Sequence, residues 1–403
     1  MGGGTGNPLL DGLPLLDDLP DLDGANVLVR VDFNVPLRPC VGERALVADD
    51  FRIRAALPTL NFLLAEGATV TACTHLGRPG GAPDKQWDLG PVRDELSVLA
   101  PKVELLENLR FDPGEELNDP GFVEKLVHGH DAYVNDAFGV SHRRHASVVG
   151  PPSYLPSAAG FLLQREIEAL GTLLGAPAHP FVAVVGGAKV ADKLGVLKAL
   201  IQRVDALVVG GGMAYTFLAA AGHDVGGSLV DPDRIADCAA LLESGTPVLL
   251  PTDIVALEPG AAFGCDCSDG EVRTVGADLP EGWQGLDIGP DTADRYAAEI
   301  VGAGTVLWNG PMGVFEDDRF GAGTAGVARA MAECGGFTVV GGGDSAAAVD
   351  ALGLDSQISF ISTGGGASLE LLEYGDLPGL AALRGASNAP SPARRPSPGS
   401  TLR

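Results

Sequence analysis

The chain has 403 residues, of which 45% are hydrophobic; this length exceeds what one hydrophobic core organises, so two α/β domains are expected. The formal net charge of −26, from 53 acidic and 27 basic residues, argues against nucleic acid or an anionic membrane as a partner, because both carry negative charge. No run reaches the roughly 18 apolar residues of a membrane span, and residues 1–23 contain no Lys or Arg, unlike a secretory signal, so we expect a cytoplasmic protein.

Short apolar runs rich in Val and Ile alternate with helical stretches along the chain. This alternation predicts an α/β fold with two doubly wound parallel-sheet (Rossmann-like) domains, whose sheets are buried on both faces. The candidate strands, in chain order, are residues 26–33, 69–74, 132–135, 181–185, 206–209, 305–308, 337–340 and 358–361.

A Pro-rich break at Pro151, Pro152 and Pro156 precedes a helical stretch over 158–174, which GAPAHP ends. We therefore predict an N-terminal domain over 1–155, an interdomain helix over 156–177 and a C-terminal domain over 178–365. A segment over 366–385 is expected to return toward the N-terminal domain. The tail 386–403 is Pro-, Ser- and Arg-rich with few apolar residues, which predicts disorder.

Polar side chains follow the predicted strands of the N-terminal half, where ligands of doubly wound sheets collect. The segments RVDFN, THLGRP, ENLRF and NDAFGVSHRRH supply them, and Arg52 opens the helix after the first strand. One Arg alone would more often form a surface ion pair. Five near successive strand ends predict an anion pocket, because the planar guanidinium makes paired hydrogen bonds to carboxylate or phosphate: Arg30, Arg52, Arg78, Arg110 and Arg143.

Histidines and cysteines do not predict a metal site. His75, His142 and His145 have no carboxylate or Cys that completes a ligand set. We favour His75 as a substrate contact, with a structural His as the alternative. Cys265 and Cys267 form an isolated CxC motif, for which we expect no metal role.

Glycine-rich segments follow the predicted strands of the C-terminal half: VVGGAKVADK, VVGGGMAYTF, WNGPMGVFE, VVGGGDS and STGGGAS. Glycines there let backbone N–H groups and helix N-termini approach a phosphate. On a helix starting after Gly187, Lys189 and Lys193 would project from one face toward that ligand. Each loop alone is equally well a structural turn, but together with Asp344 they predict a nucleotide-phosphate site with a divalent cation.

Commoner nucleotide motifs are missing. The chain has no GK dipeptide, which excludes a P-loop, and DAFG and HRR do not match the protein-kinase signatures. A GxGxxA at 341–346 keeps an NAD(P)-binding oxidoreductase open as an alternative. It is weakened because the strand that follows lacks an Asp or Glu to hold a ribose.

Taken in order, RVDFNVP, HLGRP, ENLRF, NDAFG with HRRH, GGAKVADK, GGGMAYTF, GLDIGP, WNGPMGVFE, GGGDSAAAV and STGGGASLELLE resemble the phosphoglycerate kinase family over residues 15–385. The resemblance implies reversible transfer of a phosphoryl group between 1,3-bisphosphoglycerate with ADP and 3-phosphoglycerate with ATP, in glycolysis. It implies Mg²⁺ and small-molecule substrates as the only partners, and we expect a monomer.

The resemblance also implies a role for individual residues. The phosphoglycerate would be bound by Asp32, Asn34, Arg52, His75, Arg78, Arg110 and Arg143, with Arg52 and Lys189 nearest the transferred group. Asp344 would hold the magnesium, and the nucleotide would be bound by Lys189, Lys193, Gly210, Gly211, Gly212, Glu316, Gly341, Gly342, Gly343, Asp344 and Ser345. Hinge motion is expected at the interdomain helix and at STGGGAS.

Departures from the family pattern are few. Thr74 stands where Ser is more usual and Ser345 where some members have Thr, so both hydroxyls are retained. The acidity resembles members from salt-accumulating organisms, because near 1 M salt the Debye length is about 3 Å and a carboxylate-covered surface repels itself little. An ordinary acidic enzyme is the alternative, and a hinged binding protein without catalysis is a third functional class.

Overall fold

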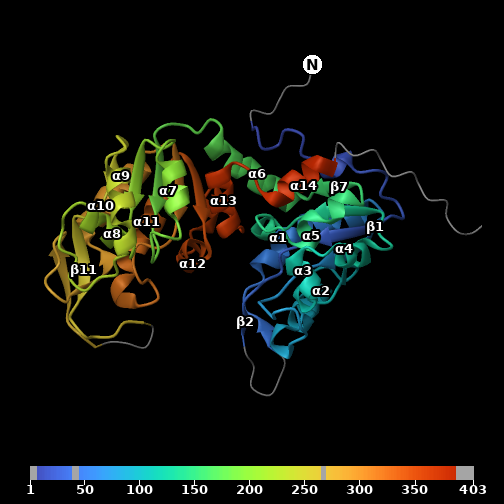
Figure 1. Ribbon diagram of the computed structural model, residues 1–403, viewed down its shortest axis with the longest axis horizontal. Helices are drawn as coiled ribbons and strands as arrows, with labels where there is room; N and C mark the ends of the chain where they lie inside the picture. Colours follow the sequence, from blue (N-terminus) through green and yellow to red (C-terminus); the bar gives the residue numbers. More distant parts are fainter. Residues whose placement is uncertain (1–6, 39–44, 265–268, 387–403) are drawn as a thin grey trace, which may run out of the picture. The chain divides into compact units, whose positions relative to one another are not determined.

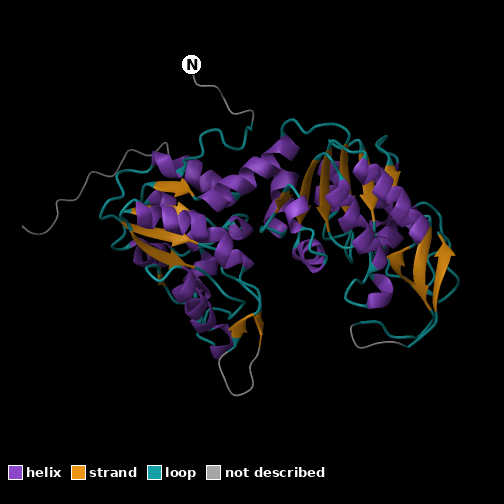
Figure 2. Cartoon of the chain, turned by 180° about the vertical axis from the view of Figure 1, so that it is seen from behind, coloured by secondary structure: helices purple, strands orange, loops and turns teal. Residues whose placement is uncertain are grey.

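The computed structural model describes residues 7–38, 45–264 and 269–386, in which helices and strands alternate along the chain (Figures 1 and 2). The tail after Ala386 and the CxC pair lie outside these described residues.

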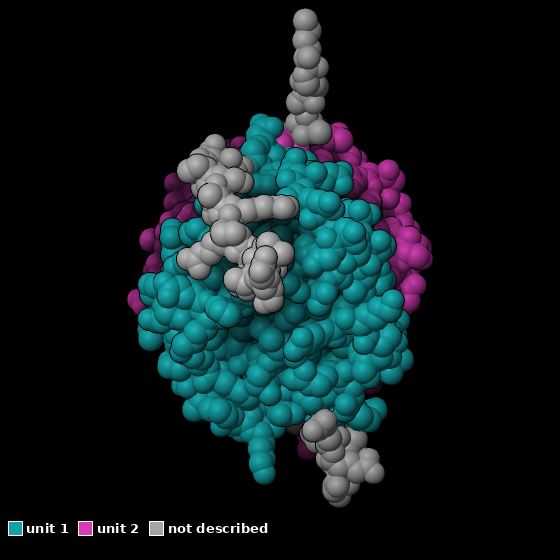
Figure 3. Space-filling view, turned by 90° about the vertical axis from the view of Figure 1, so that its right-hand side faces the viewer, with its two compact units in different colours: residues 1–5, 9–167, 376–403 teal, residues 6–8, 168–375 magenta. Residues whose placement is uncertain are grey.

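The chain divides into two compact units, coloured separately in Figure 3. The first contains Leu9–Ile167 and the C-terminal part from Asp376; the second contains Glu168–Gly375 with a short N-terminal stretch. Helix α6 (Phe161–Leu174) therefore begins in the first unit and ends in the second.

The first unit is built on a five-stranded sheet in which all neighbouring strands are parallel. The spatial order is β5-β4-β1-β6-β7. Because the chain starts in the middle, moves outward on one side and then on the other, the sheet is doubly wound. The strands are β1 (Asn26–Arg30), β4 (Thr69–Cys73), β5 (Glu104–Leu105), β6 (Ala132–Asn135) and β7 (Ser157–Ala159), with a separate hairpin of β2 (Leu37–Arg38) and β3 (Leu46–Val47).

Helices cover this sheet, and from Val27 to Arg30 every residue of β1 is buried. Capping residues in the sequence determine where these helices begin. At the start of α4, the Asp119 carboxylate accepts the N–H of Phe122, and Pro120 is the first helical residue. The helices are α1 (Phe51–Ala65), α2 (Gly90–Leu99), α3 (Pro113–Leu117), α4 (Pro120–Val127), α5 (Ala146–Val149) and α14 (Pro378–Ala386).

The second unit repeats the plan with a six-stranded parallel sheet of order β10-β9-β8-β14-β15-β16. Its central strands are buried along their whole length, as parallel strands with covered faces require. The strands are β8 (Phe181–Val185), β9 (Ala206–Val209), β10 (Val248–Leu249), β14 (Thr305–Asn309), β15 (Phe337–Gly341) and β16 (Phe360–Ile361).

A three-stranded antiparallel sheet of order β12-β11-β13 lies between β10 and β14 in the sequence of this unit. It consists of β11 (Asp253–Leu257), β12 (Val272–Gly276) and β13 (Gln284–Ile288). The helices of the unit are α7 (Leu194–Leu200), α8 (Ala214–Ala220), α9 (Ile235–Leu242), α10 (Pro290–Val301), α11 (Ala322–Glu333), α12 (Gly343–Ala351) and α13 (Gly366–Tyr374).

The fold class is confirmed, with local differences from the expected elements. β1 ends at Arg30 rather than at residue 33, and a short strand, β7, precedes α6 because Ser157–Ala159 pair with β6. The return to the first unit starts at Asp376, later than residue 366, because α13 packs in the second unit. No helix of the described residues is long and apolar enough to cross a membrane.

The strand order reverses beside the first strand of each sheet, between β1 and β6 and between β8 and β14. The carboxyl ends of parallel strands at such a switch point form the usual ligand-binding crevice of doubly wound folds. The predicted site residues follow these strands in both units.

Candidate active site

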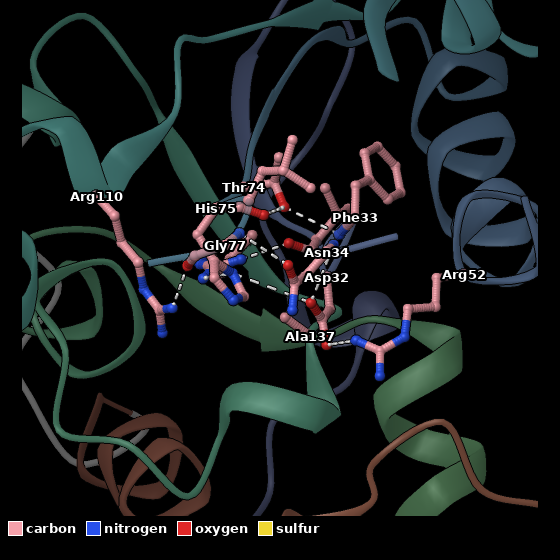
Figure 4. A network of polar contacts seen from close by, with 12 residues as sticks. Asp32, Phe33, Asn34, Arg52, Thr74, His75, Gly77, Arg110 and Ala137 are labelled. Atoms are coloured by element: carbon pink, nitrogen blue, oxygen red, sulfur yellow. Dashed lines mark hydrogen bonds and ion pairs between the residues drawn. The ribbon is translucent and has the colours of Figure 1, made fainter. Parts of the chain in front are cut away.

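A polar cluster lies at the carboxyl ends of β1 and β4 in the first unit (Figure 4). Asp32 Oδ2 accepts a hydrogen bond from Arg52 of α1 at 2.6 Å, which joins the strand end to the helix start. Asn34 Oδ1 accepts the N–H of Gly77 at 2.9 Å, and Thr74 Oγ1 accepts the N–H of Phe33 at 2.9 Å. These bonds tie the loops after β1 and β4 together, which brings Asp32, Asn34 and His75 side by side.

Arg30 was expected in the anion pocket, and this is wrong. Its side chain is fully buried, because Arg30 is the last residue of β1 and faces the interior. The guanidinium donates to His75 Nδ1 at 3.2 Å, to Ser147 Oγ at 2.8 Å and to the carbonyl of Val31. Arg30 therefore holds the His75 ring from the interior of the unit and is not exposed to contact a ligand.

Two further buried residues, Ser147 and Glu115, hold Arg30 in place, and sequence patterns did not predict either of them. Glu115 of α3 is fully buried and accepts the hydroxyl of Ser147 at 2.6 Å and its N–H at 2.9 Å. Ser147 thereby links Glu115 to Arg30. Nothing in the spacing of ENLRFDPGEE distinguishes the buried Glu115 from the half-exposed Glu116, so sequence patterns offered no signal.

The three predicted site histidines, His75, His142 and His145, are held neutral. Burial, followed by nearby arginines that include Arg30, holds the pKa of His75 well below its ordinary value. Burial, followed by Arg143, lowers the pKa of His142 to about 4, and burial, followed by Arg110 and Arg143, lowers that of His145 to about 4. At neutral pH these rings donate or accept hydrogen bonds without adding charge.

The remaining predicted arginines differ in exposure. Arg110 is buried, donates to the carbonyl of Gly77 at 2.7 Å and pairs with Glu116 at 3.2 Å; burial is the main cause of its lowered pKa. Arg143 is half-buried, and its charge contributes to the lowered pKa of both His142 and His145. Arg78 is exposed on the loop after β4. The structure thus brings Arg110 and Arg143 to the histidines and leaves Arg78 facing solvent.

Three glycine-rich loops pack against one another at the switch point of the second unit. Gly187 N–H donates to the carbonyl of Pro311 at 3.1 Å, and Gly211 N–H donates to that of Met312 at 2.9 Å. At Gly211 φ is +66°, and a Cβ would lie 2.6 Å from Gly187 N, so only glycine fits. The loops after β8, β9 and β14 therefore form one surface, in which Gly210 and Gly212 flank Gly211.

The two lysines of VVGGAKVADK do not share a helix face, and that expectation is wrong. Residues 186–190 form a bent loop, residues 191–193 form a turn, and α7 begins only at Leu194. Lys193 turns inward, where its ammonium donates to Gly186 O at 2.6 Å and to Asn309 Oδ1 at 2.6 Å; burial lowers its pKa to about 8. Lys189 is exposed and makes no hydrogen bond or ion pair with the part of the chain that the structure describes.

The GGGDS segment forms the end of β15 and the first turn of α12. Gly341 is buried, Gly342 adopts a φ of +92°, and α12 begins at Gly343, which is exposed. Asp344 is exposed in the first turn. Ser345 is buried and its hydroxyl accepts the N–H of Gly310 at 2.7 Å, so its side chain joins α12 to the loop after β14.

Glu316 is exposed on the loop between β14 and α11. The next residue, Asp317, is buried and accepts hydrogen bonds from Arg319 Nε at 2.9 Å and from the N–H of Gly264 at 3.1 Å. The hydrogen bond from the Arg319 side chain, followed by that from Gly264, holds the pKa of Asp317 well below its ordinary value. The loop that presents Glu316 is therefore fixed by its neighbours.

An arginine- and histidine-lined cluster in one doubly wound unit and glycine loops with lysines in the other define a two-unit α/β phosphotransferase. The family model for phosphoglycerate kinase matches residues 16–104 and 99–375. The chain belongs to the phosphoglycerate kinase family.

Relatives and solved structures agree with this membership. Phosphoglycerate kinases of Salinispora arenicola and Moorella thermoacetica are each 51% identical, over 89% of this chain and 96% and 95% of their own. The solved structure of phosphoglycerate kinase from Coxiella burnetii has a TM-score of 0.83 and 35% identity, and covers 93% of this chain and 100% of that one. These findings do not support the oxidoreductase alternative.

Proposed function

We propose that the chain catalyses the reversible, Mg²⁺-dependent transfer of a phosphoryl group between 1,3-bisphosphoglycerate with ADP and 3-phosphoglycerate with ATP. The observation that carries this proposal is the difference between the two switch points, one lined by Arg and His side chains and the other by glycine loops with the exposed Lys189. The names of the relatives agree with it.

The first unit would bind the phosphoglycerate. Arg52, Arg78, Arg110 and Arg143 supply positive charge and fork-shaped donors for its phosphate and carboxylate groups. His75 and Asn34 would add neutral hydrogen bonds, and Asp32 holds Arg52 in place at 2.6 Å. Arg52 is the residue that we assign to the transferred group.

The second unit would bind the nucleotide, with its phosphates on the glycine loops and the start of α12. The donors fit a magnesium ion: Asp344 offers one exposed carboxylate beside Gly342 and Gly343, and Mg²⁺ commonly takes one or two carboxylates together with substrate phosphates and water. When bound, the ion would neutralise charge on the phosphate oxygens. Lys189, exposed and unpaired within the described residues, is free to meet the transferring phosphoryl group.

Phosphoryl transfer requires in-line placement and positive charge around the equatorial oxygens rather than a protein nucleophile. Arg52 and Lys189 would supply that charge. An acyl phosphate is vulnerable to water, so we propose that the units close only when both substrates are bound. α6 and residues 362–368 are the hinges that we assign to this motion.

A coupled assay of ATP-dependent 3-phosphoglycerate consumption, with and without Mg²⁺, tests the proposal. We expect turnover that requires the metal ion. Binding of both ligands without turnover would instead identify a non-catalytic binding protein, and absence of nucleotide binding would refute the assignment of the second unit.

We further propose that the protein is cytoplasmic and monomeric, and that its net charge of −26 reflects adaptation to salt. Activity and melting temperature should both rise on addition of KCl. If both are highest without added salt, the adaptation to salt is refuted and the protein is an ordinary acidic enzyme.

A further inference from the structure

Asp287 of β13 is a buried carboxylate to which the proposed transfer assigns no role. Its side chain is 1% exposed, and no ion pair joins it to a basic side chain of the described residues. Oδ2 accepts the N–H of Gly323 at 2.8 Å, and Oδ1 accepts the N–H of Ile288 at 2.9 Å. Burying a carboxylate whose partners are backbone N–H groups costs free energy of folding. The contacts that Asp287 makes in the interior of the unit therefore need an explanation.

Those contacts lie at both ends of one loop. Gly323 is in the first turn of α11, and Gly313 belongs to WNGPMGVFE after β14. A Cβ at either glycine would overlap the Asp287 carboxylate, so both backbones pack directly on it. Asp287 therefore joins the beginning and the end of residues 313–323.

A bulge in β13 adds a second anchor to the same loop. The pairing with β11 shifts between Val255 and Ala256, which leaves Leu286 outside the regular register. Its carbonyl accepts the N–H of Val314 at 2.9 Å. A bulge of this kind redirects backbone groups away from the ladder, and here it redirects one to the loop.

Glu316 lies within the segment that these anchors fix. Asp317 N–H donates to the carbonyl of Val314 at 3.0 Å, and Phe320 N–H donates to that of Asp317 at 2.8 Å. Two consecutive turns thus connect the anchored Val314 to the buried Phe320. The position of Glu316 follows from that of Val314 and Gly313.

We propose that Asp287 is a positioning residue for nucleotide binding, which acts by holding residues 313–323 so that Glu316, which the family resemblance assigns to the nucleotide, is presented to it. This inference rests on the proposed function and adds a residue that does not touch the ligand. It predicts that loss of Asp287 weakens binding of the nucleotide and leaves binding of the phosphoglycerate unchanged.

The test compares Asp287→Ala, Asp287→Asn, Glu316→Gln and Asp287→Ala/Glu316→Gln with the full-length wild type. Asp287→Ala should raise the KM for ADP about tenfold, which corresponds to a loss of about 1.4 kcal/mol of binding free energy. The KM for the phosphoglycerate substrate should be unchanged. Asp287→Asn keeps one carbonyl acceptor and should restore part of the loss. In the Glu316→Gln background, Asp287→Ala should add little, because both changes act on one contact.

Amide hydrogen exchange of the ligand-free protein gives an independent readout. The amides of Val314 and Gly323 should exchange faster in Asp287→Asn, which also serves if Asp287→Ala fails to fold. Equal rises in both KM values, a fully additive double variant, or unchanged exchange would each overturn the inference. If the wild type binds no ADP, the proposed function fails, and the exchange data still show whether Asp287 holds the loop.

Discussion

Arg30 donates a hydrogen bond to Nδ1 of His75 at 3.2 Å, between two buried side chains. A guanidinium has no acceptor, so Nδ1 carries no proton and the ring's single proton is on Nε2. Burial, together with Arg30, holds the pKa of His75 well below its ordinary value. His75 is therefore a neutral donor at Nε2, the nitrogen that Arg30 leaves available.

His75→Gln should retain more affinity for 3-phosphoglycerate than His75→Asn. The amide of Gln reaches toward the Nε2 position, whereas that of Asn reaches only toward Nδ1. We expect Asn to lose about tenfold to a hundredfold, because a hydrogen bond to a charged group contributes about 1.5–3 kcal/mol. Calorimetric titration measures this, and equal losses in the two variants would contradict the assigned tautomer.

Arg52→Ala should lower kcat by about 10²–10³, the usual effect of removing one donor that stabilises a transition state. Stability should change by less than about 1 kcal/mol, because the pair with Asp32 is partly exposed. Arg54→Ala is the matched control, since Arg54 lies on the same helix and pairs with Asp50. Steady-state kinetics and urea unfolding check both, and near-normal turnover in Arg52→Ala would show that another residue meets the transferred group.

Lys189→Met and Lys193→Met should separate catalysis from structure. Lys193 donates to Gly186 O and Asn309 Oδ1, so its loss leaves acceptors unpaired and should cost about 1–3 kcal/mol of stability. Because Lys189 is exposed, Lys189→Met should change the free energy of unfolding by less than about 0.5 kcal/mol, while turnover falls. Thermal unfolding and the coupled assay distinguish the two; a stable Lys193→Met variant would contradict the inward bonding.

Asp136→Asn should change how stability depends on pH. Asp136 is fully buried, accepts the N–H of Leu162 at 2.9 Å, and burial raises its pKa to about 7. A folded pKa above the unfolded value means that stability is present at low pH and is lost as the pH rises through about 7. Relative to the wild type, the Asn variant should therefore become more stable as the pH rises from about 4 to about 7, by up to about 4 kcal/mol in total.

Urea unfolding of both proteins over this pH range measures the difference. Burial also raises the pKa of Asp287 to about 7, but Asp287 titrates in both proteins, so its effect cancels in the comparison. A stability difference that stays constant with pH would show that Asp136 is ionised throughout.

Much of the fold could be predicted because buried parallel strands leave an apolar run that is easy to recognise, as in Phe181–Val185. The antiparallel sheet was missed because its edge strand, Val272–Gly276, is largely exposed and carries no such run. The helix expected after Gly187 does not form because Lys193 is bonded to the loops after β8 and β14.

The candidate site was predictable where its residues stand beside strand ends, as Asp32 and His75 do. Its supports were not, because sequence does not say which carboxylate folding will bury. Glu115 and Asp287 lie far along the chain from the groups that they hold, Ser147 and Gly323. Their partners are set by tertiary packing alone.

The chain enters the second unit at Glu168 and returns to the first at Asp376, which imposes an order on biosynthesis. Apart from its short N-terminal stretch, the second unit is complete at Gly375, but the first still awaits α14, whose Leu380 and Leu383 are fully buried. Gly379 N–H reaches Ser141 O at 2.8 Å, and Arg384 reaches Leu9 O at 2.6 Å. During synthesis, the first unit can therefore complete its core only after residues 376–386 have followed the second unit.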